Sequence, residues 1–247
     1  MTFQFTISPD FPPNRIAGWY IFNTWLQKAS GLAVHLEMYP DFESQRRAIR
    51  EDRVDMIYAN PYDAAMLIRE KGFVALTRPA EKVDEAVVVT RADAPYASVD
   101  DLKPGTRVAM TNDPAVNLLG MMMLEPVELD GSNIGVREVK SYAVAAKLLV
   151  QEKADVAFFL KEAFEKLTNL TREQLKVLVE SQIEDLYHLF LVGPRLGEQR
   201  EILRNLLVEM HTTPQGKDAL DNLGFSRWEA VSESDAEFMM NLIEALK

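Results

Sequence analysis

The chain has 247 residues, and its 27 lysines and arginines against 38 aspartates and glutamates give a net charge of −11. A nucleic-acid-binding protein needs a basic face for its phosphate contacts, so this balance argues against that class. With 47% hydrophobic and 26% charged residues, the composition is that of a globular protein with one large core or two modest ones. The absence of cysteine excludes disulfides, thiolate metal sites and cysteine nucleophiles.

The N-terminus alternates polar and apolar residues from Phe3 to Ser8, which predicts a strand. It lacks the basic start and apolar stretch of a secretory signal, and no run in the chain approaches the roughly 20 apolar residues of a membrane span. We therefore expect no membrane span. Two locations stay open: the cytoplasm, or an export compartment if a signal was removed and Met1 was added.

Strands and helices alternate in the N-terminal part of the chain. The strands are expected at 1–8, 32–39 and 54–59, and the helices at 16–31, 41–53 and 60–72. Gly31 and Gly72 provide helix ends, and Asn60-Pro61 provides a helix start. Such alternation is typical of a parallel sheet with helices on its faces.

The same alternation restarts after two apolar strands expected at 73–78 and 86–91. Further strands are expected at 107–110, 136–139, 155–160, 176–180 and 187–192, and helices at 113–124, 142–153 and 162–170. Asp113-Pro114 is a favourable pair for starting a helix. The residues after the last expected strand predict helices at 197–211, 214–223 and 232–246, so the C-terminal end is expected to be entirely helical.

These elements favour an α/β chain of two lobes joined by a two-stranded hinge. The expected boundaries are 1–83 and 190–247 for lobe 1, 88–185 for lobe 2, and 84–91 and 186–192 for the hinge strands. A chain that leaves a lobe and later returns makes two crossings, which allow closure around a ligand. The alternative is one continuous doubly wound sheet with no moving parts.

Four segments spread over nearly the whole chain carry a family resemblance. They are Glu51–Pro61, Val87–Gly105, Ser141–Ala157 and Pro214–Trp228. The last contains P-Q-G-K followed by L-G-F and a tryptophan. In this order the segments resemble the phosphate, phosphite and phosphonate ABC-transporter substrate-binding proteins.

This resemblance implies a type II periplasmic-binding fold and a non-enzymatic solute-binding protein that closes on a small polar or anionic ligand. It also implies an ABC permease as partner and a periplasmic location if the chain is exported. Two other functions stay open on the same fold: a cytoplasmic sensor or regulatory protein, and a scaffold that has lost its ligand. An enzyme is the weakest alternative, because no activated nucleophile or oriented base is visible.

The chain departs from the family pattern where the family binds its anion. There the second lobe presents a Ser/Thr-rich helix start of the type D-P-x-S-T-S-G, whose hydroxyls and amides hold the anion. Here the corresponding stretch, Asp113–Gly120, has no hydroxyl. The family's His-Asp pair is replaced by Tyr142-Ala143. We therefore expect an altered anion site that binds a free phosphonate dianion weakly.

Ligands of open α/β folds lie beyond the carboxyl ends of the parallel strands, and this rule selects the candidate site residues. They are Ser8, Asp10, Phe11, Tyr39, Asn60 and Tyr62 in lobe 1, and Thr111, Asn112, Tyr142, Phe159 and Lys161 in lobe 2. Aromatic walls with a few amide and hydroxyl donors suit a small zwitterion or an organic anion with an apolar portion. Asn60 and Thr111 could equally be helix caps, Tyr142 a buried aromatic and Lys161 a solvated cation.

No metal, cofactor or catalytic residue is expected. His35, His188 and His211 lie in separate predicted elements without metal-ligand spacing. No HExxH or EF-hand pattern is present, and neither are the glycine-rich phosphate loops or a GxSxG turn.

Overall fold

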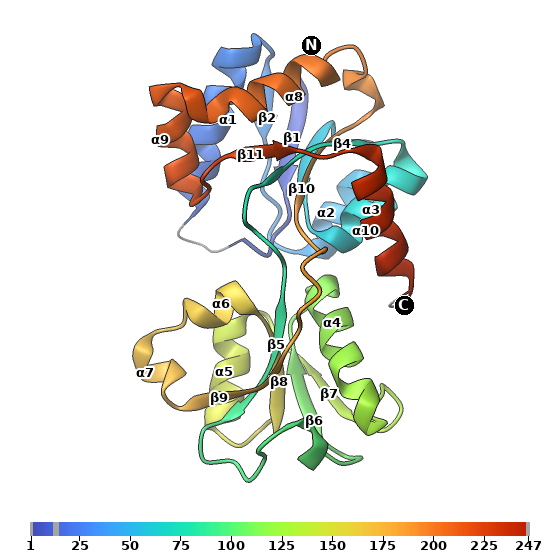
Figure 1. Cartoon of the computed structure of the whole chain (residues 1–247), viewed down its shortest axis with the longest axis vertical. Helices are drawn as coiled ribbons and strands as arrows, with labels where there is room; N and C mark the ends of the chain where they lie inside the picture. The colour runs from blue at the N-terminus through green and yellow to red at the C-terminus, as the bar shows by residue number, and fades with distance from the viewer. Residues whose placement is uncertain (1, 12–14, 246–247) are drawn as a thin grey trace. The chain divides into compact units, whose positions relative to one another are not determined.

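The computed structural model describes residues 2–11 and 15–245, and these form two compact units. Unit 1 comprises the described residues up to Val83 together with Tyr187–Ala245, and unit 2 comprises Asp84–Leu186. The chain therefore passes between units twice, at 83–84 and at 186–187 (Figure 1). Each unit has its own sheet, which excludes the single continuous sheet.

Unit 1 is built on a six-stranded sheet in the order β11-β4-β10-β3-β1-β2. Strand β1 runs parallel to β2 and β3, whereas β10 is antiparallel to β3 and β4, and β11 is antiparallel to β4. The parallel part is the one that the N-terminal alternation predicts. The strands are β1 (Phe3–Ile7), β2 (Val34–Leu36), β3 (Met56–Ala59), β4 (Val74–Pro79), β10 (Leu189–Val192) and β11 (Trp228–Ala230).

Six helices cover the two faces of this sheet. Helices α1, α8 and α9 lie on one face, and α2, α3 and α10 lie on the other (Figure 1). Helix α1 ends at Gly31, and α3 begins after Asn60 and ends at Gly72, as the sequence predicts. The helices are α1 (Ile16–Ser30), α2 (Phe42–Arg50), α3 (Pro61–Lys71), α8 (Arg200–Glu209), α9 (Pro214–Leu223) and α10 (Glu233–Ala245), with short 3-10 turns η4 (Pro194–Leu196) and η5 (Met210–Thr212).

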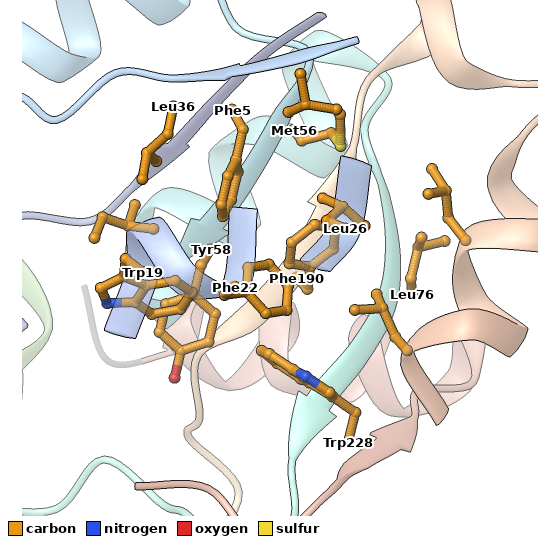
Figure 2. Close-up of a cluster of buried hydrophobic side chains, with 14 of the residues drawn as sticks. Phe5, Trp19, Phe22, Leu26, Leu36, Met56, Tyr58, Leu76, Phe190 and Trp228 are labelled. Carbon is orange, nitrogen blue, oxygen red and sulfur yellow. The ribbon is translucent and has the colours of Figure 1, made fainter. Parts of the chain in front are cut away.

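Aromatic rings from distant parts of the chain form the core of unit 1 (Figure 2). The ring of Phe5 on β1 lies with its centroid 5.8 Å from that of Phe22 on α1 and 5.5 Å from that of Phe190 on β10. Trp228 on β11 completes the cluster, 5.9 Å from Phe22 and 6.0 Å from Phe190. Buried aromatic rings of this size contribute strongly to the energetics of a core. Their packing therefore adds to the strand pairing that joins β10 to β3 and β11 to β4.

Two predictions about secondary structure are wrong. The C-terminal part is not entirely helical, because β11 lies between α9 and α10. The single helix expected at 162–170 is two short helices, α6 (Lys161–Glu165) and α7 (Asn169–Arg172), and the hydroxyl of Thr168 caps the second of them. A capping threonine at this position starts a new helix instead of continuing the first.

Unit 2 is built on a five-stranded sheet in the order β7-β6-β8-β5-β9. Strand β6 is parallel to β7 and β8, and β5 is antiparallel to β8 and β9. Helix α4 packs on β5 and β8, and α5 packs on β8 and β6 from the other face (Figure 1). The remaining bounds are β5 (Ala86–Arg91), η2 (Val99–Asp101), β6 (Arg107–Met110), α4 (Pro114–Leu124), η3 (Glu125–Val127), β7 (Gly135–Glu138), α5 (Tyr142–Val150), β8 (Val156–Leu160) and β9 (Leu175–Glu180).

The two strands expected to connect the lobes lie inside the sheets. Strand β5 pairs with β8 on one side and β9 on the other, and β10 pairs with β3 and β4. The chain passes from one unit to the other in the segment between β4 and β5 and in the segment between β9 and β10. That these crossings act as a hinge stays a prediction.

An ion pair joins the starts of two parallel strands in unit 2. Arg107 donates from Nη2 to Oδ1 of Asp155 (2.6 Å) and from Nε to Oδ2 (3.0 Å), and its backbone N–H donates to Oδ2 (2.8 Å). These bonds from Arg107 lower the pKa of the Asp155 carboxyl, although its partial burial opposes them. The pair thus favours the ionised carboxylate in the folded state.

We expect Arg107→Ala to lower the free energy of unfolding by about 1 kcal/mol at pH 7, because the pair is partly exposed. A carboxyl whose pKa is lowered by folding stabilises the fold above its ordinary pKa of 3.8, and this stabilisation is lost as the pH falls through the folded-state pKa. The difference between wild type and variant should therefore stay constant between pH 5 and pH 8 and shrink at pH 3. Urea unfolding followed by circular dichroism measures it, with Arg137→Ala on the exposed strand β7 as control.

Candidate functional site

The carboxyl ends of β1 and β3 bring Ser8 and Asn60 together in unit 1. The backbone N–H of Ser8 donates to the carbonyl of Tyr58 (2.8 Å), and the Ser8 hydroxyl oxygen accepts from the backbone N–H of Asn60 (3.0 Å). Both side chains are buried, and that of Asn60 is 0% exposed. The amide oxygen of Asn60 accepts from the N–H of Asp63 (2.9 Å) and caps α3. These two residues therefore shape the edge of the sheet and the start of α3.

Tyr62 lies beside a buried ion pair at the same helix start. Arg46 on α2 donates from Nε to Oδ1 of Asp63 (2.7 Å), and Asn60 donates from Nδ2 to the other oxygen of Asp63 (2.9 Å). The guanidinium carbon of Arg46 lies 5.5 Å from the centre of the Tyr62 ring, a cation–π distance. Tyr62 is partly exposed.

Asp10 pairs with a histidine at the same edge of the sheet. Nε2 of His188 lies 3.1 Å from Oδ2 of Asp10, and the two side chains are 10% and 4% exposed. The imidazole stacks on the ring of Tyr58, with centroids 4.9 Å apart and planes at 24°. Tyr58 in turn contacts Trp19, so the pair rests on the aromatic core (Figure 2).

The two other candidates of unit 1 have different surroundings. Burial raises the pKa of the Tyr39 phenol, Arg53 opposes this effect, and Glu37 and Glu51 add to it. Glu37 follows β2, and Glu51 and Arg53 lie in the turn after α2. Phe11 is partly buried and packs against the hydrophobic core of unit 1.

The start of α4 brings together Thr111, Asp113 and Tyr142 in unit 2. Asp113 caps the helix, its Oδ1 accepting the backbone N–H groups of Ala115 (3.1 Å) and Val116 (3.2 Å). The hydroxyl of Tyr142, at the start of α5, donates to Oδ2 of Asp113 (3.0 Å). Thr111 is buried and accepts weakly from the N–H of Asp113 (3.4 Å).

Next to this cap, Asn112 is exposed and Phe159 is fully buried. The ring of Phe159 on β8 stacks against that of Tyr142, with centroids 5.5 Å apart and planes at 25°. Phe159 therefore supports Tyr142 from within the core of unit 2, and Asn112 is the candidate whose amide is open to solvent.

Lys161 follows β8 and forms an ion pair with Glu180 on β9. This contact raises the pKa of the lysine, and burial opposes the rise only in part. The backbone N–H of Lys161 donates to the carbonyl of Glu85 (2.8 Å). The Glu85 carboxylate is buried and accepts the Ser181 hydroxyl and the N–H of Ile183 (2.9 Å), close to both chain crossings.

Three further residues join the two groups of side chains, which are the one around Asn60 in unit 1 and the one around Tyr142 in unit 2; they are His188, Asp63 and Asp113. The sequence marks Asp113 as a helix cap near the expected anion site, but it does not mark His188 or Asp63 as site residues. The rule of residues after parallel strands cannot select His188, because it precedes the antiparallel strand β10, whose start lies at the same edge. Asp63 and Asp113 follow Asn60 and Asn112 closely, and the cap pattern Asp-Pro was a signal for Asp113.

Within the part of the chain that the structure describes, no group of three His, Asp or Glu side chains could hold a metal ion. Among the same residues, no helix is both long and apolar enough to cross a bilayer. The residues around Asn60 in unit 1 and those around Tyr142 in unit 2 each combine aromatic rings with hydrogen-bonding side chains. Such a combination suits a small polar ligand.

Comparison with known proteins gives one family. Residues 5–236 match the model of the phosphonate ABC-transporter periplasmic substrate-binding proteins. PhnD1 from Prochlorococcus marinus, solved in complex with methylphosphonate, superimposes with a TM-score of 0.82 at 12% identity, covering 99% of this chain and 98% of that one. The comparison with curated proteins found no match.

Two other solved structures show the same fold. A binding protein of an ABC phosphonate transporter from Pseudomonas aeruginosa has a TM-score of 0.79 at 18% identity, covering 100% of this chain and 89% of that one. A protein from Xanthomonas citri, solved with a bound chloride ion, has a TM-score of 0.80 at 15% identity, covering 99% and 98%.

These likenesses confirm the predicted α/β, two-lobed fold of type II periplasmic binding proteins. The family match spans most of the sequence, and the members of this family are transporter components without enzymatic activity. The chain belongs to the phosphonate ABC-transporter periplasmic substrate-binding protein family.

Proposed function

We propose that this chain is the solute-binding component of an ABC importer and that it closes on a small polar ligand through an altered anion site. Family membership supports the role and implies a permease as partner and a periplasmic location. We further propose that Asp10, Asn60 and Tyr62 of unit 1 and the candidates around α4 of unit 2 each contribute to ligand binding. Methylphosphonate is bound in one structural relative. The altered site is our inference from the sequence of this chain, which lacks hydroxyl side chains at 113–120.

The observation that carries the altered site is the first turn of α4. A phosphonate head group needs several hydrogen-bond donors for its oxygens, and hydroxyl side chains in a first helical turn supply them together with backbone amides. Here the side chains at these positions are the methyl of Ala115 and the isopropyl of Val116, which are buried. Neither can donate to an anion.

The charges around these candidate residues also disfavour binding of a doubly charged anion. Arg46 faces Asp63, and Lys161 faces Glu180. Each of these two cations already has a carboxylate partner, so its field is largely compensated before a ligand arrives. A ligand with two negative charges would find little uncompensated positive charge here, whereas a zwitterion or a neutral polar molecule needs none.

The test is a ligand panel of methylphosphonate, inorganic phosphate, amino acids and neutral polyols, each at 1 mM. We expect a zwitterionic or neutral compound to raise the melting temperature and to lower the radius of gyration measured by solution scattering, as closure requires. A ligand at 100 times its Kd adds about 2.7 kcal/mol to stability, which such melts detect easily.

Asn112→Ala should weaken binding of the compound found, because Asn112 exposes its amide at the start of α4. The matched control is Asn205→Ala, which removes an exposed amide on α8. A panel in which no compound shifts either measurement would count against the binding role, and micromolar binding of methylphosphonate would count against the altered site.

A further inference from the structure

Arg46 on α2 uses only one of its three guanidinium nitrogens within unit 1. Nε donates to Oδ1 of Asp63 (2.7 Å), and among the residues that the structure describes this is the one hydrogen bond of the side chain. Nη2 is buried and has no hydrogen-bond partner among the same residues. A guanidinium carries five N–H donors, and leaving a buried donor unbonded costs free energy. An acceptor is therefore missing at Arg46.

Three neighbours hold the guanidinium group of Arg46. Its partner Asp63 is 1% exposed, and the other oxygen of that carboxylate accepts from Nδ2 of Asn60 (2.9 Å). The guanidinium carbon also lies 5.4 Å from the centre of the Phe42 ring and 5.5 Å from that of the Tyr62 ring, which are both cation–π distances. A donor that is already held in position loses little conformational entropy when it binds a ligand.

Arg46 also lies beside the candidate site residues of unit 1. Asn60 connects them, because its backbone N–H donates to the Ser8 hydroxyl oxygen (3.0 Å) and its side chain donates to Asp63. The Arg46 side chain is 28% exposed, and the neighbouring Tyr62 is partly exposed. The guanidinium is thus part of the same edge of the sheet and is open to solvent on one side.

The surroundings of Arg46 favour one kind of acceptor. Asp63 balances the charge of Arg46, so a dianion gains little net attraction here. A single carboxylate needs two parallel N–H donors in one plane, and Nη1 and Nη2 of a guanidinium provide them. A carboxamide has one oxygen, and its NH₂ group would face N–H donors. With a net charge of −11, the chain also repels a plain anion, which favours a carboxylate balanced by an ammonium group.

We propose that Arg46 is a ligand-binding residue of unit 1 and that Nη1 and Nη2 donate to the carboxylate of a zwitterionic ligand, an amino acid or a compound built like one. The carboxylate reaches the exposed part of the guanidinium directly and Nη2 after a rotamer change in the site, which is common on binding. This inference rests on the proposed function, because it names the ligand class of the same site. The rule of residues after strands does not select Arg46, since it lies within a helix.

The experiment compares carboxylates with their carboxamides. L-leucine, L-serine, L-phenylalanine and γ-aminobutyrate, and the carboxamide of each, are titrated by calorimetry into the full chain. We expect at least one of the four acids to bind and its carboxamide to bind at least 10-fold more weakly, because the NH₂ group cannot accept from the guanidinium. The quantity that tests Arg46 is this acid-to-amide affinity ratio.

Arg46→Gln should lower the acid-to-amide ratio at least 10-fold, because it removes both free nitrogens of the guanidinium. The matched control is Arg47→Gln on the same helix, where the exposed Arg47 is paired with Glu43, and it should leave the ratio unchanged. A merely structural defect would weaken binding of the acid and of the amide together. A ratio that stays at the wild-type value in Arg46→Gln therefore overturns the inference.

Loss of the Arg46 partner leaves the buried Asp63 carboxylate with fewer donors. Should Arg46→Gln fail to fold for this reason, the double variant Arg46→Gln with Asp63→Asn removes both charges and is measured in the same way. If methylphosphonate or a neutral polyol binds to the wild type and none of the four acids does, the solute-binding role stands and the inference is overturned. If no compound binds to the wild type, the proposed function itself is contradicted and the inference falls with it.

Discussion

Replacing Trp228 with alanine is expected to lower the free energy of unfolding of unit 1 by about 3–5 kcal/mol. The indole is 1% exposed and lies at the centre of the aromatic cluster, with centroid distances of 5.3 Å to Phe225 and 5.8 Å to Tyr58. Removing it leaves a cavity among rings from α1, β3, β10 and the turn after α9, so neighbouring side chains cannot collapse into the space without moving the backbone. The edge strand β11 would also lose its main attachment to the core (Figure 2).

Urea unfolding followed by tryptophan fluorescence measures this loss. The chain has three tryptophans, and all lie in unit 1, so Trp19 and Trp25 still report on that unit in the variant. Trp228→Phe is the matched control: it keeps an aromatic ring and removes a buried indole N–H that has no hydrogen-bond partner. Trp228→Phe should lower the free energy of unfolding by less than half as much as Trp228→Ala does. A loss below 1 kcal/mol for the alanine variant would show that the cluster does not hold unit 1 together.

Strand β11 also shows where sequence reasoning fails. It has three residues, Trp228–Ala230, too few for a period-2 pattern to stand out between two helices. Its partner is β4, far away in the sequence, and the pairing is antiparallel. The family pattern does mark the tryptophan, but a motif does not state its secondary structure. The strand depends on long-range contacts, which are its pairing with β4 and the packing of Trp228 against Phe22 and Phe190.

The parallel parts of the two sheets could be predicted because their signals are local. An apolar run, a cap residue and a glycine stop recur in order along the chain, and each lies within a few residues of the next. Asn60 caps α3, Asp113 caps α4 and Gly31 ends α1 at the positions that the sequence indicates. Local hydrogen bonding decides these points, so no tertiary information is needed.

The candidate site could be predicted only in part, for the same physical reason. Ser8 and Asn60 follow parallel strands and do meet, at 3.0 Å. The contact of Tyr142 with Asp113 joins residues 29 positions apart, and that of His188 with Asp10 joins residues 178 positions apart. Their partners depend on which strands are neighbours, and the sequence leaves that order undetermined. How the site residues contribute to binding therefore stays a prediction.

Replacing Gly216 with alanine is expected to destabilise unit 1 by about 3 kcal/mol. Gly216 lies in the first turn of α9, within the P-Q-G-K segment, and a Cβ there would lie 1.9 Å from the carbonyl oxygen of Met210 and 2.8 Å from the hydroxyl oxygen of Thr213. Met210 begins η5 and is buried in the core, and Thr213 is the N-cap residue of α9. The turn must open to admit the methyl group.

Opening this turn would also weaken the cap of α9, because the N–H of Gly216 donates to the Thr213 hydroxyl oxygen at 3.1 Å. Alanine has a better helix propensity than glycine by about 1 kcal/mol, and this gain offsets only part of the clash. Tryptophan fluorescence should show the loss, whereas Gly131→Ala, whose Cβ would have no neighbour within 4 Å, should unfold like the wild type. Equal stability of the two variants would mean that the Met210 carbonyl can move away freely, and the glycine of this family segment would then need an explanation other than close packing.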